Sequence, residues 1–158
     1  GRAQVIVNGT NRVRSYDIQN GKVLWACGGQ TVNAIPSPVF GLDKVYVSSG
    51  YRGRAMYAIK LGHEGDLTDT KAIAWEVHRS TPYIPSPLLH QKKIYFLSAN
   101  QARLSCYDAY DGKAHYVSEP INGLFGVYHS KIEYGIYSNR DIISRDYILR
   151  RVIHHHNL

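Results

Sequence analysis

Residues 35–49 read Ile-Pro-Ser-Pro-Val-Phe-Gly-Leu-Asp-Lys-Val-Tyr-Val-Ser-Ser, and residues 84–98 read Ile-Pro-Ser-Pro-Leu-Leu-His-Gln-Lys-Lys-Ile-Tyr-Phe-Leu-Ser. The two stretches align without a gap at an offset of 49 residues, and Ile, Pro, Ser, Pro, Lys and Tyr recur at matching positions. A second pattern, Tyr-Asp followed by Gly-Lys, occurs at 16–22 and again 91 residues later at 107–113. The chain is therefore expected to consist of repeats of about 40–50 residues.

A repeat of this size fits one four-stranded blade of a β-propeller. Runs of β-branched and aromatic residues between Gly- and Pro-rich turns mark the strands. We expect strands at 4–7, 12–17 and 23–26 in the first unit, at 34–40, 44–48, 55–60 and 72–78 in the second, and at 83–90, 93–97, 102–108 and 114–117 in the third. The expected fold class is all-β, a partial β-propeller of four-stranded antiparallel blades, with about three blades plus a degraded fourth.

The same alignment predicts the division of the chain. Propeller repeats occupy 1–123, with a partial first blade at 1–30, a second at 31–79 and a third at 80–123. Residues 124–158 are expected to form a degraded fourth blade, with strands near 135–137 and 147–152, or a disordered tail. Because the first unit lacks its innermost strand and three and a half repeats do not close a ring, we expect a fragment of a longer chain.

Turn chemistry supports the strand assignment. Asn20-Gly21 and Asp111-Gly112 are hairpin signals, because both central residues of a type I′ turn adopt positive φ. The paired prolines in the two Ile-Pro-Ser-Pro motifs remove ladder donors and suit an edge strand. We therefore expect these motifs to form the innermost strands, which line the central channel.

Composition narrows the classes of partner. The chain has 158 residues, with 19 Lys and Arg against 12 Asp and Glu, a net charge of +7. The basic residues are scattered, so we expect a solvated surface and no nucleic-acid partner. No apolar run approaches 18 residues, so no transmembrane segment is expected. Cys27 and Cys106 are too few for a disulfide framework and are expected to be unpaired thiols.

The segment Ser15-Tyr-Asp-Ile-Gln-Asn-Gly-Lys-Val-Leu-Trp25 resembles the tryptophan-docking motif of pyrroloquinoline-quinone-like (PQQ-like) propeller repeats. In that motif an Asp secures the turn, and the closing aromatic caps the outermost strand and stacks on the adjacent blade. The second repeat has Ala58 at the Asp position, and the third has a tyrosine in place of the closing tryptophan. The matching positions, and hence the expected structural docking residues, are Asp17, Gly21, Lys22, Trp25, Trp75, Asp108, Gly112, Lys113 and Tyr116.

The resemblance extends over about residues 1–120. The segments 28–38, 65–69 and 81–87 look like a group of bacterial PQQ-like propeller repeat proteins, which are mostly exported. This resemblance implies a quinoprotein alcohol dehydrogenase-like fold and a periplasmic, secreted or cell-envelope location.

Chemistry-bearing residues are sparse. Quinoprotein dehydrogenases, as the resemblance implies, use a catalytic Asp, Ca²⁺ ligands and two adjacent cysteines, and the chain has neither adjacent cysteines nor such a ligand set on its inner strands. The histidines show no metal-ligand spacing. We therefore expect no catalytic residue, no cofactor and no metal in this chain. The polar insertion at 62–71 matches a calcium loop poorly and is interpreted as a solvated outer-rim loop.

One loop is a candidate binding site. Tyr51, Arg52 and Arg54 place an aromatic ring among guanidinium groups, a composition that can stack on sugars or grip anionic groups. The alternative interpretation is a Gly-bracketed hairpin connection.

These observations favour a non-catalytic scaffold, or a protein- or ligand-binding platform, in a bacterial exported or envelope protein. Its partners would be a protein or a glycan, together with the missing blades of the same parent chain. Three alternatives remain: a fragment of a PQQ-dependent dehydrogenase, a polysaccharide- or envelope-binding module, and a relative of the propeller lipoprotein that assists outer-membrane protein assembly.

Overall fold

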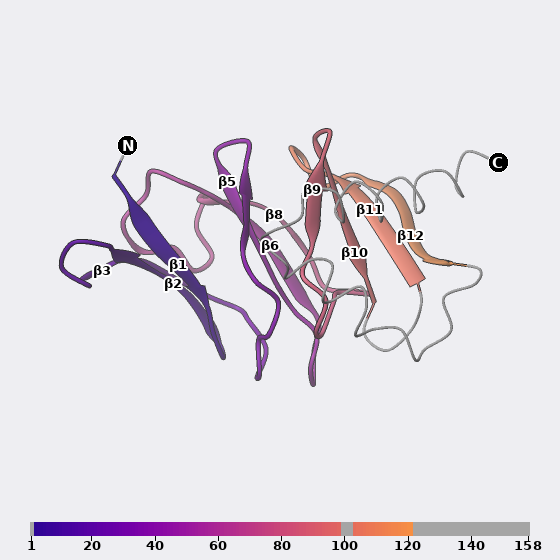
Figure 1. Ribbon diagram of the computed structural model, residues 1–158, viewed down its shortest axis with the longest axis horizontal. Helices are drawn as coiled ribbons and strands as arrows, with labels where there is room; N and C mark the ends of the chain where they lie inside the picture. The colour runs from indigo at the N-terminus through magenta and orange to yellow at the C-terminus, as the bar shows by residue number, and fades with distance from the viewer. Residues whose placement is uncertain (1, 99–102, 122–158) are drawn as a thin grey trace, which may run out of the picture.

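All regular secondary structure in the described part of the chain is β-strand. The computed structural model describes residues 2–98 and 103–121 (Figure 1). The first sheet contains β1 (Gln4–Asn8), β2 (Arg12–Asp17), β3 (Val23–Gly28) and β7 (Gly65–Asp66). The second contains β4 (Val39–Gly41), β5 (Lys44–Ser49), β6 (Ala55–Lys60) and β8 (Ile73–Val77). The third contains β9 (Leu88–His90), β10 (Lys93–Leu97), β11 (Arg103–Asp108) and β12 (Ala114–Pro120).

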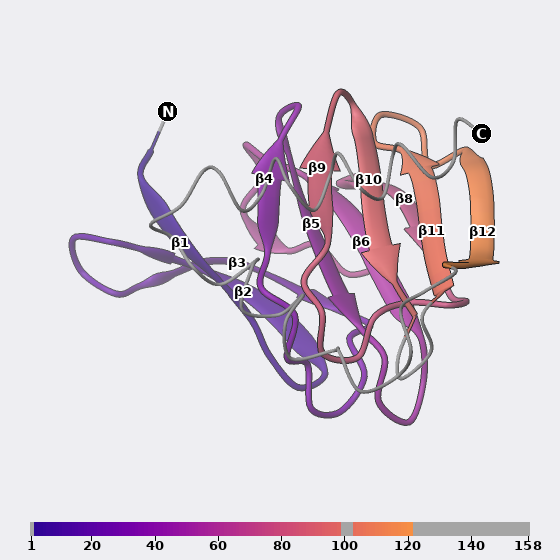
Figure 2. The same ribbon diagram turned by 45° about the vertical axis from the view of Figure 1, so that its right-hand side comes forward.

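The three sheets stack side by side, with the second between the other two (Figures 1 and 2). Two clusters of buried side chains fill the spaces between them. One joins Val13, Trp25 and Cys27 of the first sheet to Val45, Tyr57 and Ile59 of the second. The other joins Tyr46, Met56 and Trp75 of the second sheet to Ile94, Phe96 and Tyr107 of the third. The core therefore lies between sheets, which explains why every residue of β5 in the middle sheet is buried.

Corresponding strands of the second and third sheets pair in corresponding registers. Lys44 lies opposite Lys60, and its counterpart Lys93 lies opposite Asp108. Tyr46 and Tyr95 lie opposite Ala58 and Cys106 in the same way. The expected all-β architecture of four-stranded blades is confirmed.

The predicted inner strands were too long. We expected strands at 34–40 and 83–90, but only Val39–Gly41 and Leu88–His90 pair with the rest of their sheets. The Pro-Ser-Pro segments lie before these strands, because two prolines in three residues leave few N–H donors for a ladder. They still lie against each other, since the Ser37 N–H donates to Ser86 Oγ over 2.9 Å.

The insertion at 62–71 was wrongly predicted to be only a solvated loop. Its residues Gly65–Asp66 form β7, which pairs in parallel with β3 of the first sheet. The following Leu67 is 4% exposed, and its N–H donates to the Ala26 carbonyl over 2.7 Å. The insertion therefore leaves the second sheet, covers the outer edge of the first and returns.

The two Asx-Gly turns are not type I′. Gly21 and Gly112 have positive φ, of 69° and 76°, but the preceding Asn20 and Asp111 do not. In each turn the glycine N–H donates to the carbonyl of the residue four positions earlier, Asp17 or Asp108. Each loop is longer than a two-residue hairpin turn. The carboxylate of the Asp that begins it accepts a backbone N–H two residues later and so stabilises the first half of the loop.

No helix in the described residues is long and apolar enough to cross a membrane. The expected fourth blade at 124–158 lies outside the described residues.

Candidate functional site

The contact between the second and third sheets is centred on Trp75. Its indole N–H donates to the Ala109 carbonyl over 3.1 Å, and the Tyr46 hydroxyl donates to the same oxygen over 2.9 Å. The Trp75 and Tyr46 rings lie 5.8 Å apart and are tilted by 40°. A β-carbon on Gly112 would lie only 2.6 Å from Cγ of Trp75, so the ring sits directly on the turn of the next blade. Lys44 completes this contact, with its Nζ 4.4 Å from the centre of the Tyr110 ring.

Trp25 and Tyr116 occupy different environments from Trp75. The Trp25 ring is buried in the cluster between the first two sheets, but its indole N–H donates to Gln4 Oε1 of its own sheet over 3.0 Å. Tyr116 is half-buried on β12 and lies opposite Cys106. Burial raises the pKa of the Tyr116 hydroxyl. Thus the Trp75 indole bonds to the adjacent blade, whereas the Trp25 indole bonds within its own sheet.

The two motif aspartates stabilise their turns in the same way. Asp17 Oδ1 accepts the Gln19 N–H, and Asp108 Oδ1 accepts the Tyr110 N–H, each over 2.7 Å. The Gln19 N–H and the Arg2 guanidinium together hold the pKa of Asp17 below its ordinary value. Lys22 and Lys113 contribute backbone bonds to these turns and expose their side chains.

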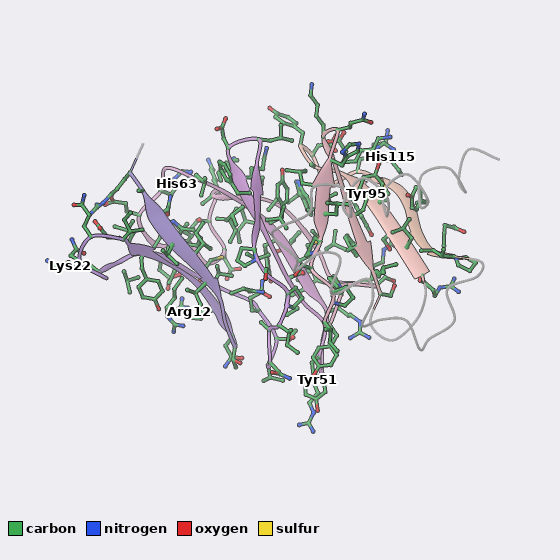
Figure 3. All side chains as sticks on the ribbon, in the orientation of Figure 1. Arg12, Lys22, Tyr51, His63, Tyr95 and His115 are labelled. Carbon is green, nitrogen blue, oxygen red and sulfur yellow. The ribbon has the colours of Figure 1, made fainter. Side chains whose placement is uncertain are left out.

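The loop at 50–54 joins β5 to β6 and so lies at the opposite end of the strands from the Asx-Gly turns, which join β2 to β3 and β11 to β12. Figure 3 labels Tyr51 in this loop. The Tyr51 ring stacks on Tyr83, with centroids 5.0 Å apart and an interplanar angle of 25°. The Arg52 guanidinium lies 5.4 Å from the centre of the Tyr51 ring. Asn33 donates from Nδ2 to the Tyr83 hydroxyl over 2.9 Å and ties the pair to the preceding segment.

Arg54 holds the loop together. Its guanidinium donates to the Gly50 carbonyl and, over 2.7 Å, to the Gly53 carbonyl. Its own carbonyl oxygen lies 3.1 Å from Nδ1 of His78. A β-carbon on Gly53 would lie 2.6 Å from Cγ2 of Thr31, so the loop packs closely on the segment that carries Asn33.

The structure adds Tyr83 and Asn33 to the candidate loop. Sequence reasoning missed both, because they lie 50 residues apart and neither adjoins Tyr51 in the chain. We define the segments 28–38, 49–54 and 78–87 as the loop face.

The two thiols are buried and unpaired in the described part of the chain. Burial raises the pKa of Cys27 to about 11 and also raises that of Cys106, so both are protonated at neutral pH. Within residues 2–98 and 103–121, no group of three or more His, Cys, Asp or Glu side chains is placed to hold a metal ion.

The three stacked four-stranded sheets are blades of a β-propeller. Two solved structures of PQQ-like propellers are similar to the chain. The crystal structure of BamB from Moraxella catarrhalis has a TM-score of 0.50 and 16% identity, over 72% of this chain and 37% of that chain. A europium-containing methanol dehydrogenase has a TM-score of 0.52 and 15% identity, over 72% of this chain and 22% of that one. The chain therefore has a PQQ-like β-propeller fold.

This chain spans less than two fifths of the length of either similar protein. No protein-family model matches the sequence, and no curated protein matches it.

Proposed function

We propose that this chain is a non-catalytic propeller module that binds a protein partner through its loop face. The observation that carries the proposal is the ordered stack of Arg52, Tyr51 and Tyr83 at one end of the blades. Tyrosine and arginine are enriched at the centres of protein interfaces, where rigid rings and planar guanidinium groups bury area at a low cost in conformational entropy.

Local contacts already hold this surface in one arrangement. Asn33 fixes the Tyr83 hydroxyl, and Arg54 fixes the loop backbone through two carbonyls. A surface ordered before binding loses less freedom on association, so more of the contact energy remains as affinity.

The chemistry-bearing side chains described here support a non-catalytic role. Asp17 and Asp108 are engaged by backbone N–H groups of their turns. The Cys27 thiol is protonated at neutral pH, since its pKa is about 11, which disfavours it as a nucleophile.

A polysaccharide-binding role has less support. Sugar rings stack on open aromatic faces, but Tyr83 covers one face of Tyr51 and the Arg52 guanidinium lies over its ring.

A second contact surface is proposed for adjoining blades. β1 lies at the edge of its sheet, in the position that β10 occupies beside β9, and has no inner strand beside it among the described residues. Val5 and Val7 on β1 are 51% and 46% exposed. A strand edge flanked by exposed valines favours addition of another strand.

We also propose an exported or cell-envelope location, on the basis of the resemblance of the repeats to mostly exported bacterial proteins. Fractionation of cells that carry the complete gene tests this location, and recovery of the protein only from the cytoplasm would contradict it.

The binding role is tested by photo-cross-linking in an extract of the source organism. A photoreactive phenylalanine analogue replaces Val32 on the loop face or, as a control, Ile18 in a turn at the opposite end. Both side chains are exposed, Val32 by 40% and Ile18 by 56%. We expect a discrete protein adduct from position 32 and none from position 18. No adduct from position 32, or the same adduct from both positions, would overturn the proposal.

A further inference from the structure

The loop face carries charge of a single sign. Its three segments contain Arg52, Arg54, Arg79 and His78, and no Asp or Glu. None of these arginines takes part in an ion pair with a described residue. A carboxylate outside these segments, that of Glu76 on β8, lies beside His78, with its Oε1 3.4 Å from Nε2.

The opposite end of the blades differs. Its turns carry four carboxylates among their lysines, those of Asp17, Asp43, Asp108 and Asp111. This end therefore carries charges of both signs, whereas the loop face carries positive groups without a carboxylate of its own.

Arg52 is the arginine best placed to bind an anion. Stacking on an aromatic face uses the flat surface of a guanidinium, while its N–H donors lie in the plane and point past the ring. The Arg52 guanidinium lies over Tyr51, and its N–H donors bond to no described residue, so they are available for a carboxylate, which accepts two parallel N–H bonds. Arg54 already donates to two loop carbonyls, so its contribution to anion binding is its positive charge more than direct hydrogen bonds.

Apolar side chains lie beside this cationic group. Val32 and Ile35 are about two-fifths exposed, at 40% and 39%. They flank Asn33, which bonds to Tyr83, so the apolar and cationic parts belong to one surface. A ligand that fits both parts carries carboxylates and aliphatic groups together.

We propose that the loop face binds an acidic peptide segment that also contains aliphatic side chains. This inference rests on the proposed protein-binding function and names the chemistry of the partner. An acidic polysaccharide fits less well, because it offers carboxylates without aliphatic side chains and because Tyr83 already stacks on the Tyr51 ring.

The test uses the full chain and a fluorescein-labelled peptide in which Glu alternates with Leu and Val. We expect saturable binding that weakens with added salt. Arg52→Gln should weaken it about tenfold, since it removes a bidentate charged contact, and Arg79→Gln should weaken it less. Lys71→Gln is the matched control, because it removes one exposed positive charge at the opposite end, and it should leave binding unchanged.

A Gln-for-Glu peptide and an alginate oligosaccharide test the ligand chemistry. We expect neither to compete effectively with the acidic peptide. Equal binding by the Arg52→Gln variant, with its urea unfolding midpoint unchanged, would overturn the proposal, as would full competition by alginate. If position 32 cross-links to a protein but the acidic peptide does not bind, the acidic ligand is refuted and the binding platform stands. If both experiments fail, both proposals fail.

Discussion

Two glycines in equivalent turns offer a direct measure of how the second blade docks on the third. Gly21 and Gly112 have similar backbone angles, with φ of 69° and 76°. Around Gly21 a new β-carbon would meet no atom within 4 Å, whereas at Gly112 it would lie 2.6 Å from Cγ of Trp75. Alanine at the first position therefore tests backbone strain alone, and alanine at the second adds the clash with the docked ring.

The expected magnitudes follow from these two environments. An alanine in the left-handed region costs about 1–2 kcal/mol, which is the whole effect expected for Gly21→Ala. Overpacking a filled site adds about 1–3 kcal/mol, so Gly112→Ala should lower the free energy of unfolding by about 2–5 kcal/mol. The ring cannot withdraw freely, because its N–H bonds to Ala109 and the Tyr46 ring lies 5.8 Å from it.

Urea unfolding of the two single variants, followed by far-ultraviolet circular dichroism, gives both free energies. Adding Trp75→Phe to Gly112→Ala removes part of the obstructing ring, so the double variant should lose less stability than the two single losses added together. If Gly112→Ala costs no more than Gly21→Ala, or if its effect adds simply to that of Trp75→Phe, then Trp75 does not lie against this turn.

Three further predictions test other contacts. Thr68 bonds to Asp66 through its side chain and its backbone, and with Arg12 it lowers the pKa of Asp66 to about 2. This carboxylate therefore stabilises the fold above about pH 4, and that stabilisation is lost as the pH falls toward 2. A nuclear magnetic resonance titration that gives Asp66 a midpoint near 3.8 would refute its contacts with Thr68 and Arg12. Burial raises the pKa of Cys27 from 9.0 to about 11, so the stability that its neutral thiol provides is present below pH 9 and is lost as the pH rises toward 11. The urea midpoint of unfolding should fall between pH 9 and pH 11 in the unmodified chain, and it should fall less in the Cys27→Ala variant. Equal decreases in the two proteins would contradict this prediction. Ser86→Ala should cost about 1 kcal/mol by removing the acceptor of the Ser37 N–H, whereas Ser37→Ala serves as the control and should cost less; equal costs measured by urea unfolding would show that the contact is absent.

Most of the sheet structure was predictable from the sequence, because each hairpin is a local pattern. The strands at 12–17 and 55–60 have the bounds expected from the sequence pattern between turn signals. The recurrence of the Ile-Pro-Ser-Pro motif also indicated that two such units would lie in corresponding places. Repetition strengthens a weak local signal, since a wrong strand assignment would have to occur at the same position in both units.

The long-range features were not predictable in the same way. β7 consists of Gly65 and Asp66, two residues with little preference for strands, and it pairs with a segment about 40 residues earlier. The stacking of Tyr51 on Tyr83 depends on how two neighbouring blades are placed, which no spacing within one blade encodes. The sequence indicated Arg52 and Tyr51 as a loop of interest, but it could not show that Tyr83 stacks on the Tyr51 ring.

The placement of Trp75 on the turn of the next blade is tested most directly by a nuclear Overhauser measurement on the unmodified chain. We expect cross-peaks between the Trp75 indole protons and the Gly112 α-protons, together with a ring-current shift of those α-protons, because the glycine lies against the ring. Assigned Trp75 and Gly112 resonances without a cross-peak between them would contradict the stacking of the second and third blades.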